Sequence, residues 1–413
     1  MKVLLITNWY PPDQPVPARR WGNLVNFLQQ SGVCCTVLTA GDGCLKSYLG
    51  RFGEEVIRIP IDNRKRPMSD VLNGGFLNGM RFYLLKMLRF FAPLVLRDST
   101  VKGWLGCVWF SGDLYEYARS SDVIIASYGP LGPLAAGFML SKRTGTPWIV
   151  DVRDAFESKD IGCFEISRRC SRSLERILLK TAVSRLTVGR ILAEYLSKNY
   201  ELSFHSIYNG WIDNDLIRDS DNVKKNIYFY YAGSIYKHQL PALEMFLDAM
   251  GLCGDYQLRL KIRLLSDDTG GCLRLLLNKH HAGNMVDLLP PVAVEQVTIE
   301  MQSALGSIVL EELDGDNKLR LGTVTGKLLG LLASGMPGIA ISSSDGEIRT
   351  LVRLAPLWIG VSDTINCQKA ILKLVGIAEG KCTHPSCNTL IFNYHMRQQA
   401  SSLINHLQEV LSK

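Results

Sequence analysis

The fold is decided by a pattern that is clearest at Ile227–Lys237, which reads Ile-Tyr-Phe-Tyr-Tyr-Ala-Gly-Ser-Ile-Tyr-Lys. A short apolar run ends at Ala232, Gly233 follows, and a helical pattern begins after Pro241. Such a sequence is typical of one unit of a parallel α/β sheet. Glycine after a strand lets backbone N–H groups approach an anion, and Lys237 offers a compact charge for a phosphate. A plain strand-to-helix turn with a solvated lysine would give the same pattern.

The same pattern recurs along the whole chain, with equal numbers of apolar runs in its two halves. The runs predicted as strands are Val3–Thr7, Cys35–Thr39, Val123–Ser127, Trp148–Val152, Arg185–Val188, Ser206–Tyr208, Ile227–Ala232, Lys261–Leu265, Val286–Leu289, Ser307–Leu310, Gly338–Ser342 and Trp358–Val361. We therefore predict an α/β protein with two doubly wound, Rossmann-like parallel-sheet domains. The first run turns polar at Thr7 and is too short for a secretory signal, which favours a buried strand.

Domain boundaries follow from the same pattern. Residues 1–215 are predicted as the N-terminal domain, 216–226 as a linker and 227–390 as the C-terminal domain, because Asp213–Asn226 is rich in charged residues. Residues 391–413 are predicted as a helix that packs back towards the N-terminal domain, since Leu403, Leu407 and Val410 recur at helical spacing. Ligands of open parallel sheets bind outside the carboxyl ends of the strands, so we expect a ligand in a cleft between the two domains.

Composition places the chain among folded proteins. It has 413 residues, with 47% hydrophobic residues, 21% charged residues and a net charge of +7, which argues against disorder. Residues 1–205 hold 27 Lys and Arg against 18 Asp and Glu, whereas residues 206–413 hold 19 against 21. A basic first half would attract phosphates, nucleic acid or anionic lipid, although a scattered solvated surface has the same count.

Cysteine usage and one basic segment bear on location. The 11 cysteines form no CxxC pair and are interpreted as reduced thiols of a cytosolic protein. Phe76–Phe110 interleaves basic and aromatic residues, as a segment at an anionic membrane surface would. Arg81, Lys86 and Arg89 interrupt it, so it cannot span a membrane. An amphipathic helix that closes the core of the first domain is the alternative.

A second anion site is predicted at the start of a helix in the C-terminal domain. Thr325 is a plausible N-cap, Gly326 and Lys327 follow it, and Gly335-Met336-Pro337 ends the helix. A helix start that carries Thr and Lys can hold an anion. Thr-Gly-Lys lacks the glycine pattern of a Walker A loop, and a well-capped core helix explains the same residues.

Carboxylates follow two predicted strands. Ser342–Glu347 comes after one strand, and Glu347 could accept hydrogen bonds from sugar hydroxyls unless the segment is an exposed turn. Asp151-Val152-Arg153-Asp154 follows Trp148 in the first half and indicates either a functional loop or a structural ion pair. The seven histidines match no metal-ligand spacing, and no GxSxG elbow occurs. We therefore expect no metal, no other cofactor and no acyl-enzyme chemistry.

Taken together, these features resemble the retaining glycosyltransferases of family four, also called group 1, over nearly the whole chain. The resemblance rests on the order of several short motifs: Tyr10-Pro11-Pro12, Ala18-Arg19-Arg20, Trp104, Asp122–Ile125, Pro147–Asp154, Ile207–Gly210, Tyr231–Lys237, Lys327-Leu328 and Leu331–Pro337. It implies the GT-B fold of two facing Rossmann-like domains, with a C-terminal helix that crosses back. The first domain would bind the acceptor and the second the nucleotide-sugar donor.

The resemblance also implies roles for particular residues. Lys237 would contact the donor diphosphate, and the helix start at Thr325–Lys327 would cradle it. Arg153 and Asp154 would be catalytic, orienting hydroxyls beside the reacting sugar. The remaining donor-binding residues would be Gly233, Ser234 and Glu347, and the loop at the cleft would use Pro12, Arg19 and Arg20.

Two positions depart from the pattern of these relatives. Ser234 stands where many of them carry Arg, and Gly330 stands where they carry a Glu that binds the nucleotide ribose. Loss of both ribose hydroxyl contacts would cost a few kcal/mol unless another group replaced them.

The resulting hypothesis is a glycosyltransferase that moves a sugar to a glycan or lipid-linked acceptor with retention, in assembly of a bacterial surface polysaccharide such as lipopolysaccharide, O-antigen or capsule. It would be cytoplasmic and peripheral at an anionic membrane. Alternatives are a sugar-nucleotide epimerase of the same fold and a catalytically silent partner subunit, the latter because of Ser234 and Gly330. Nucleic-acid binding is disfavoured because no nucleic-acid-binding motif accompanies the charge.

Overall fold

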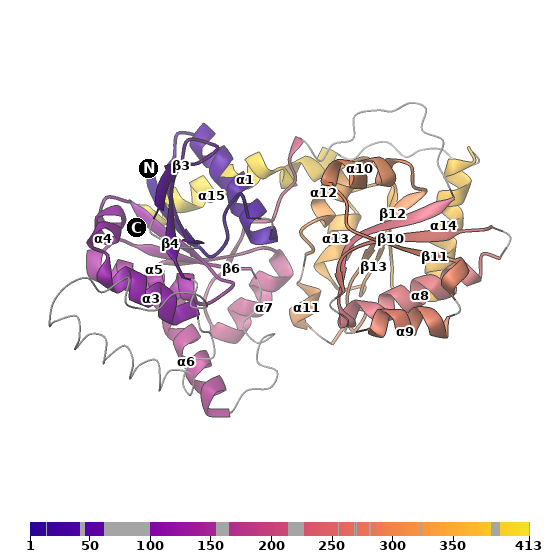
Figure 1. The fold of residues 1–413 in the computed structure, drawn as a ribbon, viewed down its shortest axis with the longest axis horizontal. Helices are drawn as coiled ribbons and strands as arrows, with labels where there is room; N and C mark the ends of the chain where they lie inside the picture. Colours follow the sequence, from indigo (N-terminus) through magenta and orange to yellow (C-terminus); the bar gives the residue numbers. More distant parts are fainter. Residues whose placement is uncertain are drawn as a thin grey trace. The chain divides into compact units, whose positions relative to one another are not determined.

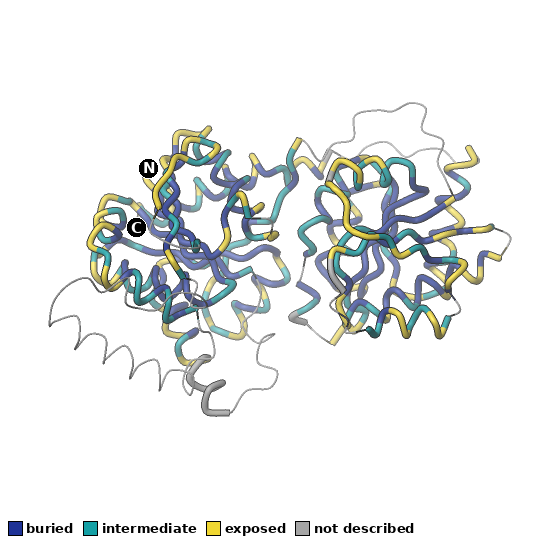
Figure 2. Tube along the Cα trace, in the orientation of Figure 1, coloured by how far each residue is buried: buried dark blue, intermediate teal, exposed yellow. Residues whose placement is uncertain are grey.

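The computed structural model describes residues 1–13, 15–41, 46–61, 100–153, 165–213, 227–254, 256–267, 269, 271–280, 282–316, 318–322, 324–380 and 389–412. The chain forms two compact units, each built on one sheet (Figure 1). The first unit consists of Met1–Val188, Ala193–Tyr208 and Gln399–Lys413, and the second of Gly189–Leu192 and Asn209–Gln398. Buried residues follow the strands of each unit (Figure 2).

The first unit contains an eight-stranded sheet in the order β3-β4-β2-β1-β5-β6-β7-β8. Its strands are β1 (Lys2–Thr7), β2 (Cys34–Gly41), β3 (Lys46–Leu49), β4 (Glu55–Pro60), β5 (Val123–Ser127), β6 (Trp148–Val152), β7 (Ser184–Thr187) and β8 (His205–Ser206). Neighbouring strands are parallel except β3 and β4. Every run predicted here overlaps a strand, although Ser206–Tyr208 shares only Ser206 with β8, and β3 and β4 were not predicted. All of β3 is exposed, and charged residues interrupt the apolar positions of β4, so neither forms an apolar run.

In the described part of the chain, six helices lie between these strands in sequence, and a seventh, α15 (Met396–Leu411), follows all of them. The six are α1 (Val16–Gln30), α3 (Thr100–Phe110), α4 (Gly112–Arg119), α5 (Gly132–Thr144), α6 (Glu165–Thr181) and α7 (Arg190–Tyr200). In α1 the side chains of Trp21, Leu24, Val25 and Leu28 are buried, at the three- and four-residue spacing of one helix face. The first residues of α7 and α15 belong to the second unit, and the remainder of each helix belongs to the first.

The basic and aromatic segment Phe76–Phe110 lies partly outside the described residues, and its last part forms α3. Val101, Trp104 and Val108 of this helix are buried, and the Trp104 indole donates a hydrogen bond of 3.2 Å to the Asn8 side chain. This part of the segment therefore closes the core of the first unit. No helix among the described residues is long and apolar enough to cross a membrane.

The second unit contains a six-stranded sheet in the order β11-β10-β9-β12-β13-β14, and all its strand pairs are parallel. Each strand was predicted: β9 (Tyr228–Ile235), β10 (Arg259–Asp267), β11 (Val286–Leu289), β12 (Gly306–Leu310), β13 (Gly338–Ile341) and β14 (Trp358–Val361). The α-helices are α8 (Leu240–Gly251), α9 (Cys272–Lys279), α10 (Val294–Gln302), α11 (Lys318–Leu321), α12 (Leu328–Ala333), α13 (Glu347–Val352) and α14 (Thr364–Ala378). The described part of this unit also contains the short 3-10 helices η4 (Lys237–Gln239), η5 (Ala282–Asn284) and η6 (Thr389–Tyr394).

Strand β9 explains why this sheet is covered on both faces. Phe229 and Tyr231 belong to the main core of the unit, where the Phe229 ring meets Phe246 of α8 edge-on. Tyr228 and Tyr230 point the other way and pack with Ala304 and with side chains of α10. Successive side chains of a strand lie on opposite faces, so an apolar run without alternation requires helices on both sides.

The strand orders define one switch point in each sheet. The chain moves outward from β9 through β10 to β11, then returns to the other side of β9 as β12. In the first unit the corresponding neighbours are β1 and β5. Ligands of open α/β sheets bind at the carboxyl ends of the strands where the order reverses. We therefore expect functional side chains at the carboxyl ends of the strands beside these two switch points.

Candidate functional site

The switch point of the second unit lies where β9 ends in Ala232–Ile235 and β12 ends before Glu311. Gly233 has φ of 140°, a conformation that side chains rarely tolerate, so the backbone there can take a path open chiefly to glycine. A β-carbon at this position would meet the Lys327 Nζ at 3.0 Å. The fold therefore brings Lys327 close to the turn at Gly233, although the two residues are almost a hundred positions apart in the sequence.

Lys327 is held by two groups at the end of β9. Its Nζ donates a hydrogen bond of 2.7 Å to the Ala232 main-chain oxygen and lies 3.7 Å from the centre of the Tyr231 ring. The residue as a whole is partly exposed, but its ammonium group is enclosed. Burial lowers the pKa of Lys327 to about 7, although the charge of Glu311 raises it in part. Near neutral pH the group can therefore gain a proton when an anion arrives.

Tyr231 supports both the lysine and the glycine turn. Its hydroxyl donates a hydrogen bond of 2.6 Å to the Ser234 main-chain oxygen, while its ring face lies against the Lys327 ammonium. Burial, together with the nearby charge of Glu311, raises the pKa of Tyr231, so the hydroxyl stays protonated and remains a donor. The side chain is 2% exposed and therefore fixed by the core around it.

An acidic residue and a histidine complete this edge of the sheet. Glu311 is buried directly after β12, and its carboxylate lies 3.8 Å from the His238 Nε2. Gln239 fixes the turn that carries His238, because its amide donates to the Leu310 oxygen and its Oε1 accepts from the Tyr236 amide, both at 3.0 Å. The position of Glu311 after the run Ser307–Leu310 was the sequence signal that could have identified it.

The predicted start of the helix is wrong. Helix α12 begins at Leu328, with Lys327 and not Thr325 at its N-cap position, and no side-chain cap is made there. The Leu328 amide already donates 3.1 Å to the Thr325 oxygen, and the Thr325 hydroxyl is buried without a hydrogen-bond partner. A helix of six residues with its first amide engaged offers little of the predicted backbone cradle. Gly326 and Lys327 precede it in the loop.

Three other predicted donor residues have different environments. Lys237 is exposed on η4, and the rings of its neighbours Tyr236 and His238 stack with centroids 5.8 Å apart. Ser234 is partly buried and accepts the Tyr231 hydrogen bond through its main chain. Glu347 is not on an exposed turn: it is 1% exposed, and its carboxylate accepts a hydrogen bond of 2.7 Å from the Ile191 amide.

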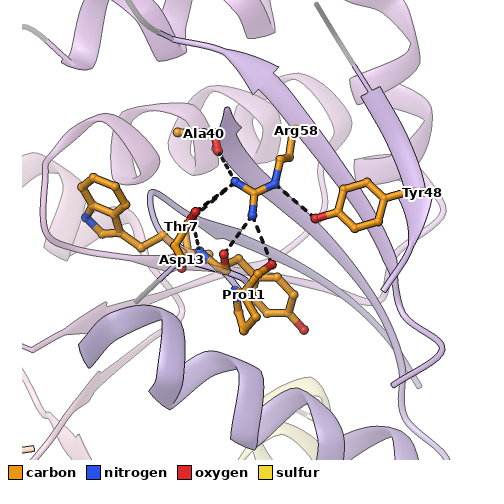
Figure 3. Close-up of polar contacts among 8 residues, drawn as sticks. Thr7, Pro11, Asp13, Ala40, Tyr48 and Arg58 are labelled. Carbon is orange, nitrogen blue, oxygen red and sulfur yellow. Dashed lines mark hydrogen bonds and ion pairs between the residues drawn. The ribbon is translucent and has the colours of Figure 1, made fainter. Parts of the chain in front are cut away.

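The switch point of the first unit carries the loop Tyr10–Asp13 at the end of β1. Figure 3 shows the Arg58 guanidinium between this loop, Ala40 and Tyr48. Its nitrogens donate to the main-chain oxygens of Tyr10 (2.9 Å), Pro11 (3.1 Å) and Ala40 (3.1 Å), and one forms an ion pair of 3.3 Å with Asp13. One side chain of β4 thus fixes the path of the loop. No apolar run indicated β4, so this residue was missed from sequence.

Tyr10 anchors the same loop on its other side. The ring is buried, and its hydroxyl donates 2.7 Å to the Glu54 carboxylate, which is itself 1% exposed. Burial raises the pKa of Tyr10, with the Glu54 hydrogen bond as the second cause. Pro12 and Arg19, predicted to lie at the cleft, are exposed on and after this loop.

Arg20 was predicted to belong to the loop at the cleft, but it is buried inside the first unit. It is 2% exposed and donates to the main-chain oxygens of Ile207 (2.9 Å) and Tyr208 (3.0 Å). It also forms a buried ion pair of 3.2 Å with Asp151, whose other oxygen accepts from Ser127 at 2.8 Å. Arg20 and Asp151 therefore tie α1, β6 and the end of β8 together inside the unit.

Arg153 lies just after β6, near the end of β5. Its guanidinium donates a hydrogen bond of 2.6 Å to the Tyr128 oxygen and lies 2.8 Å from where a β-carbon of Gly129 would stand. Asp154, the second predicted catalytic residue, lies outside the described residues. Within the described ranges, no three His, Cys, Asp or Glu side chains gather as a metal site requires.

No protein-family model matches the chain, and no curated protein is similar in sequence. Solved structures are similar in fold. Sucrose-phosphate synthase from Thermosynechococcus elongatus superposes with a TM-score of 0.62 at 14% identity, over 99% of this chain and 96% of that one. The catalytic domain of starch synthase IV from Arabidopsis thaliana, solved with ADP and acarbose, gives a TM-score of 0.60 at 9% identity, over 100% of this chain and 99% of that domain. This chain has the GT-B fold.

The same comparison includes a second kind of enzyme. A putative UDP-N-acetylglucosamine 2-epimerase from Listeria monocytogenes superposes with a TM-score of 0.52 at 12% identity, over 99% of this chain and 97% of that one. The GT-B fold by itself therefore leaves two reaction classes to consider. The choice between them depends on the residues at the two switch points, because function resides in sites and not in folds.

Proposed function

We propose that this protein is a retaining glycosyltransferase of family four that uses a nucleotide-sugar donor and a glycan or lipid-linked acceptor. The reaction would serve assembly of a bacterial surface polysaccharide. The GT-B fold supports this proposal, since one similar structure is a starch synthase with bound ADP and another a sucrose-phosphate synthase. Among proteins with this fold, the order of short motifs in the sequence resembles that of family four, which supports the choice of this family.

One observation carries the proposal: an enclosed lysine beside a glycine turn at the switch point of the second unit. Transfer of the sugar leaves negative charge on the departing diphosphate. Lys327 would neutralise this charge, because its Nζ lies next to Gly233, where the backbone can approach a ligand closely. With a pKa of about 7 in the ligand-free protein, Lys327 would take up a proton as the diphosphate binds.

The other residues would complete the reaction. Lys237, exposed on η4 directly after β9, would supply a second positive charge to the diphosphate. Arg153, with Asp154 after it in sequence, would orient hydroxyls of the sugar or acceptor. In retention by front-face attack, the leaving phosphate oxygen takes the proton of the acceptor hydroxyl as the new glycosidic bond forms. Such a mechanism requires no protein nucleophile.

Association with a membrane is proposed from charge and exposed aromatic rings. Trp109 and Phe110 at the end of α3 are 55% and 46% exposed. The Arg143 guanidinium lies 3.9 Å from the Trp109 ring centre, so aromatic and basic groups share this surface. This combination suits peripheral binding at an anionic bilayer, at the cytoplasmic face.

The deciding experiment measures nucleotide binding and its dependence on the lysine. A thermal-shift panel of UDP, GDP, ADP, CMP and dTDP and their sugars is run on the wild type, Lys327→Ala and Lys237→Ala. We expect one nucleotide to stabilise the wild type and to stabilise Lys327→Ala much less, with Lys279→Ala as an exposed control. Anomeric NMR signals of the product then report retention. A wild type that responds to none of these compounds would favour the silent partner subunit.

A sugar-nucleotide epimerase is the second candidate, favoured by the buried Glu311 beside His238 and by the fold similarity to a putative 2-epimerase. An epimerase needs acid and base groups aimed at the sugar carbon. The donor is incubated in D₂O without acceptor, and the recovered sugar nucleotide is analysed by mass. Incorporated deuterium would establish the epimerase and exclude the transferase.

A further inference from the structure

A hollow of about 260 Å³ lies between α13, the edge strand β14 and α14 in the second unit. The side chains that give it its chemical character are Arg349, Ser362, Asn366, Lys369 and Lys373. None of the residues that line it is acidic. Strand β14 is at the edge of the sheet, whereas the switch point lies between β9 and β12, so this hollow is separate from the proposed donor site.

Arg349 of α13 lines the hollow. Its Cδ and Nε lie 2.8 Å and 3.0 Å from where a β-carbon of Gly360 would stand, so its side chain runs across β14 at a residue without a side chain. Its Nη1 is buried and has no hydrogen-bond partner. An arginine remains charged in proteins, and a buried donor without a partner is costly. Burial, the largest cause, and the neighbouring Arg353 lower the pKa of Arg349, whereas the charge of Asp363 raises it in part.

Helix α14 supplies the other positive charges. Asn366, Lys369 and Lys373 are three and four residues apart, which places them along one face of the helix. Asp363, the acidic residue nearest in sequence, is the N-cap of α14. Its oxygens accept 2.8 Å from the Asn366 amide and 2.7 Å from the Asn366 side chain. Asp363 thus caps the helix, and its negative charge also acts on Arg349 and Lys369 and offsets part of their positive charge.

We propose that this hollow binds the phosphate group of a small anion, either inorganic phosphate or the phosphate monoester of a sugar. A planar guanidinium binds two phosphate oxygens at once, and ammonium groups add charge around it. The volume falls just below the range of roughly 300–1,000 Å³ that drug-sized ligands occupy, which suits a phosphate or phosphorylated sugar better than a nucleotide sugar. Arg349, which lines the hollow, would supply the guanidinium to this anion, and Lys369 and Lys373 would add their ammonium groups.

The test is a calorimetric titration of the whole chain, first with inorganic phosphate and then, in a separate experiment, with glucose 6-phosphate. We expect a dissociation constant near or below about 1 mM. Arg349→Gln should weaken binding roughly tenfold or more, because it removes a charge-assisted donor. The double variant Lys369→Gln/Lys373→Gln should weaken binding by a smaller factor, and it should fold normally because both lysines are exposed.

Two controls separate this hollow from other sites. Arg274→Gln removes one positive charge from an exposed position of α9 and should bind both probes as the wild type does. Any binding that is lost in Lys327→Ala but kept in Arg349→Gln belongs to the proposed donor site and not to this hollow. Tighter binding of glucose 6-phosphate than of phosphate would identify a monoester, and the reverse order the free anion. The proposal is overturned if neither probe binds, or if the cavity variants bind as tightly as the controls.

Discussion

Lys327 and Ala232 are joined by a hydrogen bond of 2.7 Å from the lysine ammonium to the main-chain oxygen at the end of β9. The lysine expected at the start of a helix thus caps a strand almost a hundred residues earlier. It does so over the face of Tyr231, in a place enclosed enough to lower its pKa to about 7. Charge at the proposed donor site therefore depends on pH near neutrality.

Nucleotide affinity should depend on pH through Lys327. An anion favours the charged lysine, so binding raises its pKa and takes up a proton above pH 7. Affinity for the nucleoside diphosphate should then fall by up to about tenfold per pH unit between pH 7 and 9. In Lys327→Met this dependence should disappear, whereas Lys237→Met should keep it. Calorimetric titrations at three pH values provide the measurement, and equal slopes in the two variants would contradict the assignment.

The stability of the free protein should show the opposite trend. Between pH 7 and about 10.5 the unfolded chain binds a proton at Lys327 and the folded chain does not. The free energy of unfolding should therefore gain up to about 1.4 kcal/mol per pH unit from this group as pH rises. Urea unfolding of Lys327→Met should lack that gain. If wild type and variant keep a constant difference in stability across this range, the lysine is not enclosed as described.

The Tyr231 ring and hydroxyl should have separable effects. Tyr231→Phe keeps the ring under Lys327 but loses the hydrogen bond to Ser234, so the lysine pKa should change little while stability falls by about 1 kcal/mol. Tyr231→Leu loses the cation–π contact and should lower the lysine pKa further. Lysine-side-chain NMR titrations report both. A larger pKa change in the Phe variant than in the Leu variant would reverse the assigned roles.

Arg58 should be essential for the loop after β1. Arg58→Ala removes donors from three main-chain oxygens and leaves Asp13 without its ion-pair partner, so we expect a loss of about 2–4 kcal/mol in the free energy of unfolding. Arg58→Lys should retain only part of the stability that Arg58→Ala loses, because an ammonium group cannot reach all these acceptors. Arg51→Ala, at an exposed position, is the control. If Arg58→Ala is nearly as stable as the wild type, the conformation of the loop does not depend on Arg58.

Acid should destabilise the first unit through His205. Its ring stacks on His406 of α15 with centroids 4.3 Å apart, and burial lowers the pKa of His205 below its usual value although Glu409 partly raises it. Below about pH 6.5 the unfolded state binds a proton more readily, so stability should fall as pH decreases. His205→Phe keeps a flat ring and should reduce this loss. Urea midpoints at pH 7.5 and 5.5 provide the comparison, and equal losses in both proteins would exclude His205 as the cause.

The fold was largely predictable because the strands of parallel sheets are apolar on both faces. Runs such as Ile227–Ala232 and Gly338–Ser342 therefore stand out without any tertiary information, and each became a strand. Strand β4 escaped notice because its charged residues lie between buried ones. The start of α12 was misplaced because Thr325 has the chemistry of an N-cap, while the chain around it bonds differently.

The two-sheet architecture and the residue types gathered near the strand ends can be derived from the order of residues alone, since both follow from local periodicity and from glycine after a strand. Which charged groups are enclosed and which are exposed depends instead on the packing of the folded chain. Arg20, adjacent to exposed Arg19, is buried with Asp151, and Lys327 is enclosed while Lys237 is not. Such differences depend on the distance to groups far along the chain and on the water that packing removes, and neither is a property of neighbouring residues.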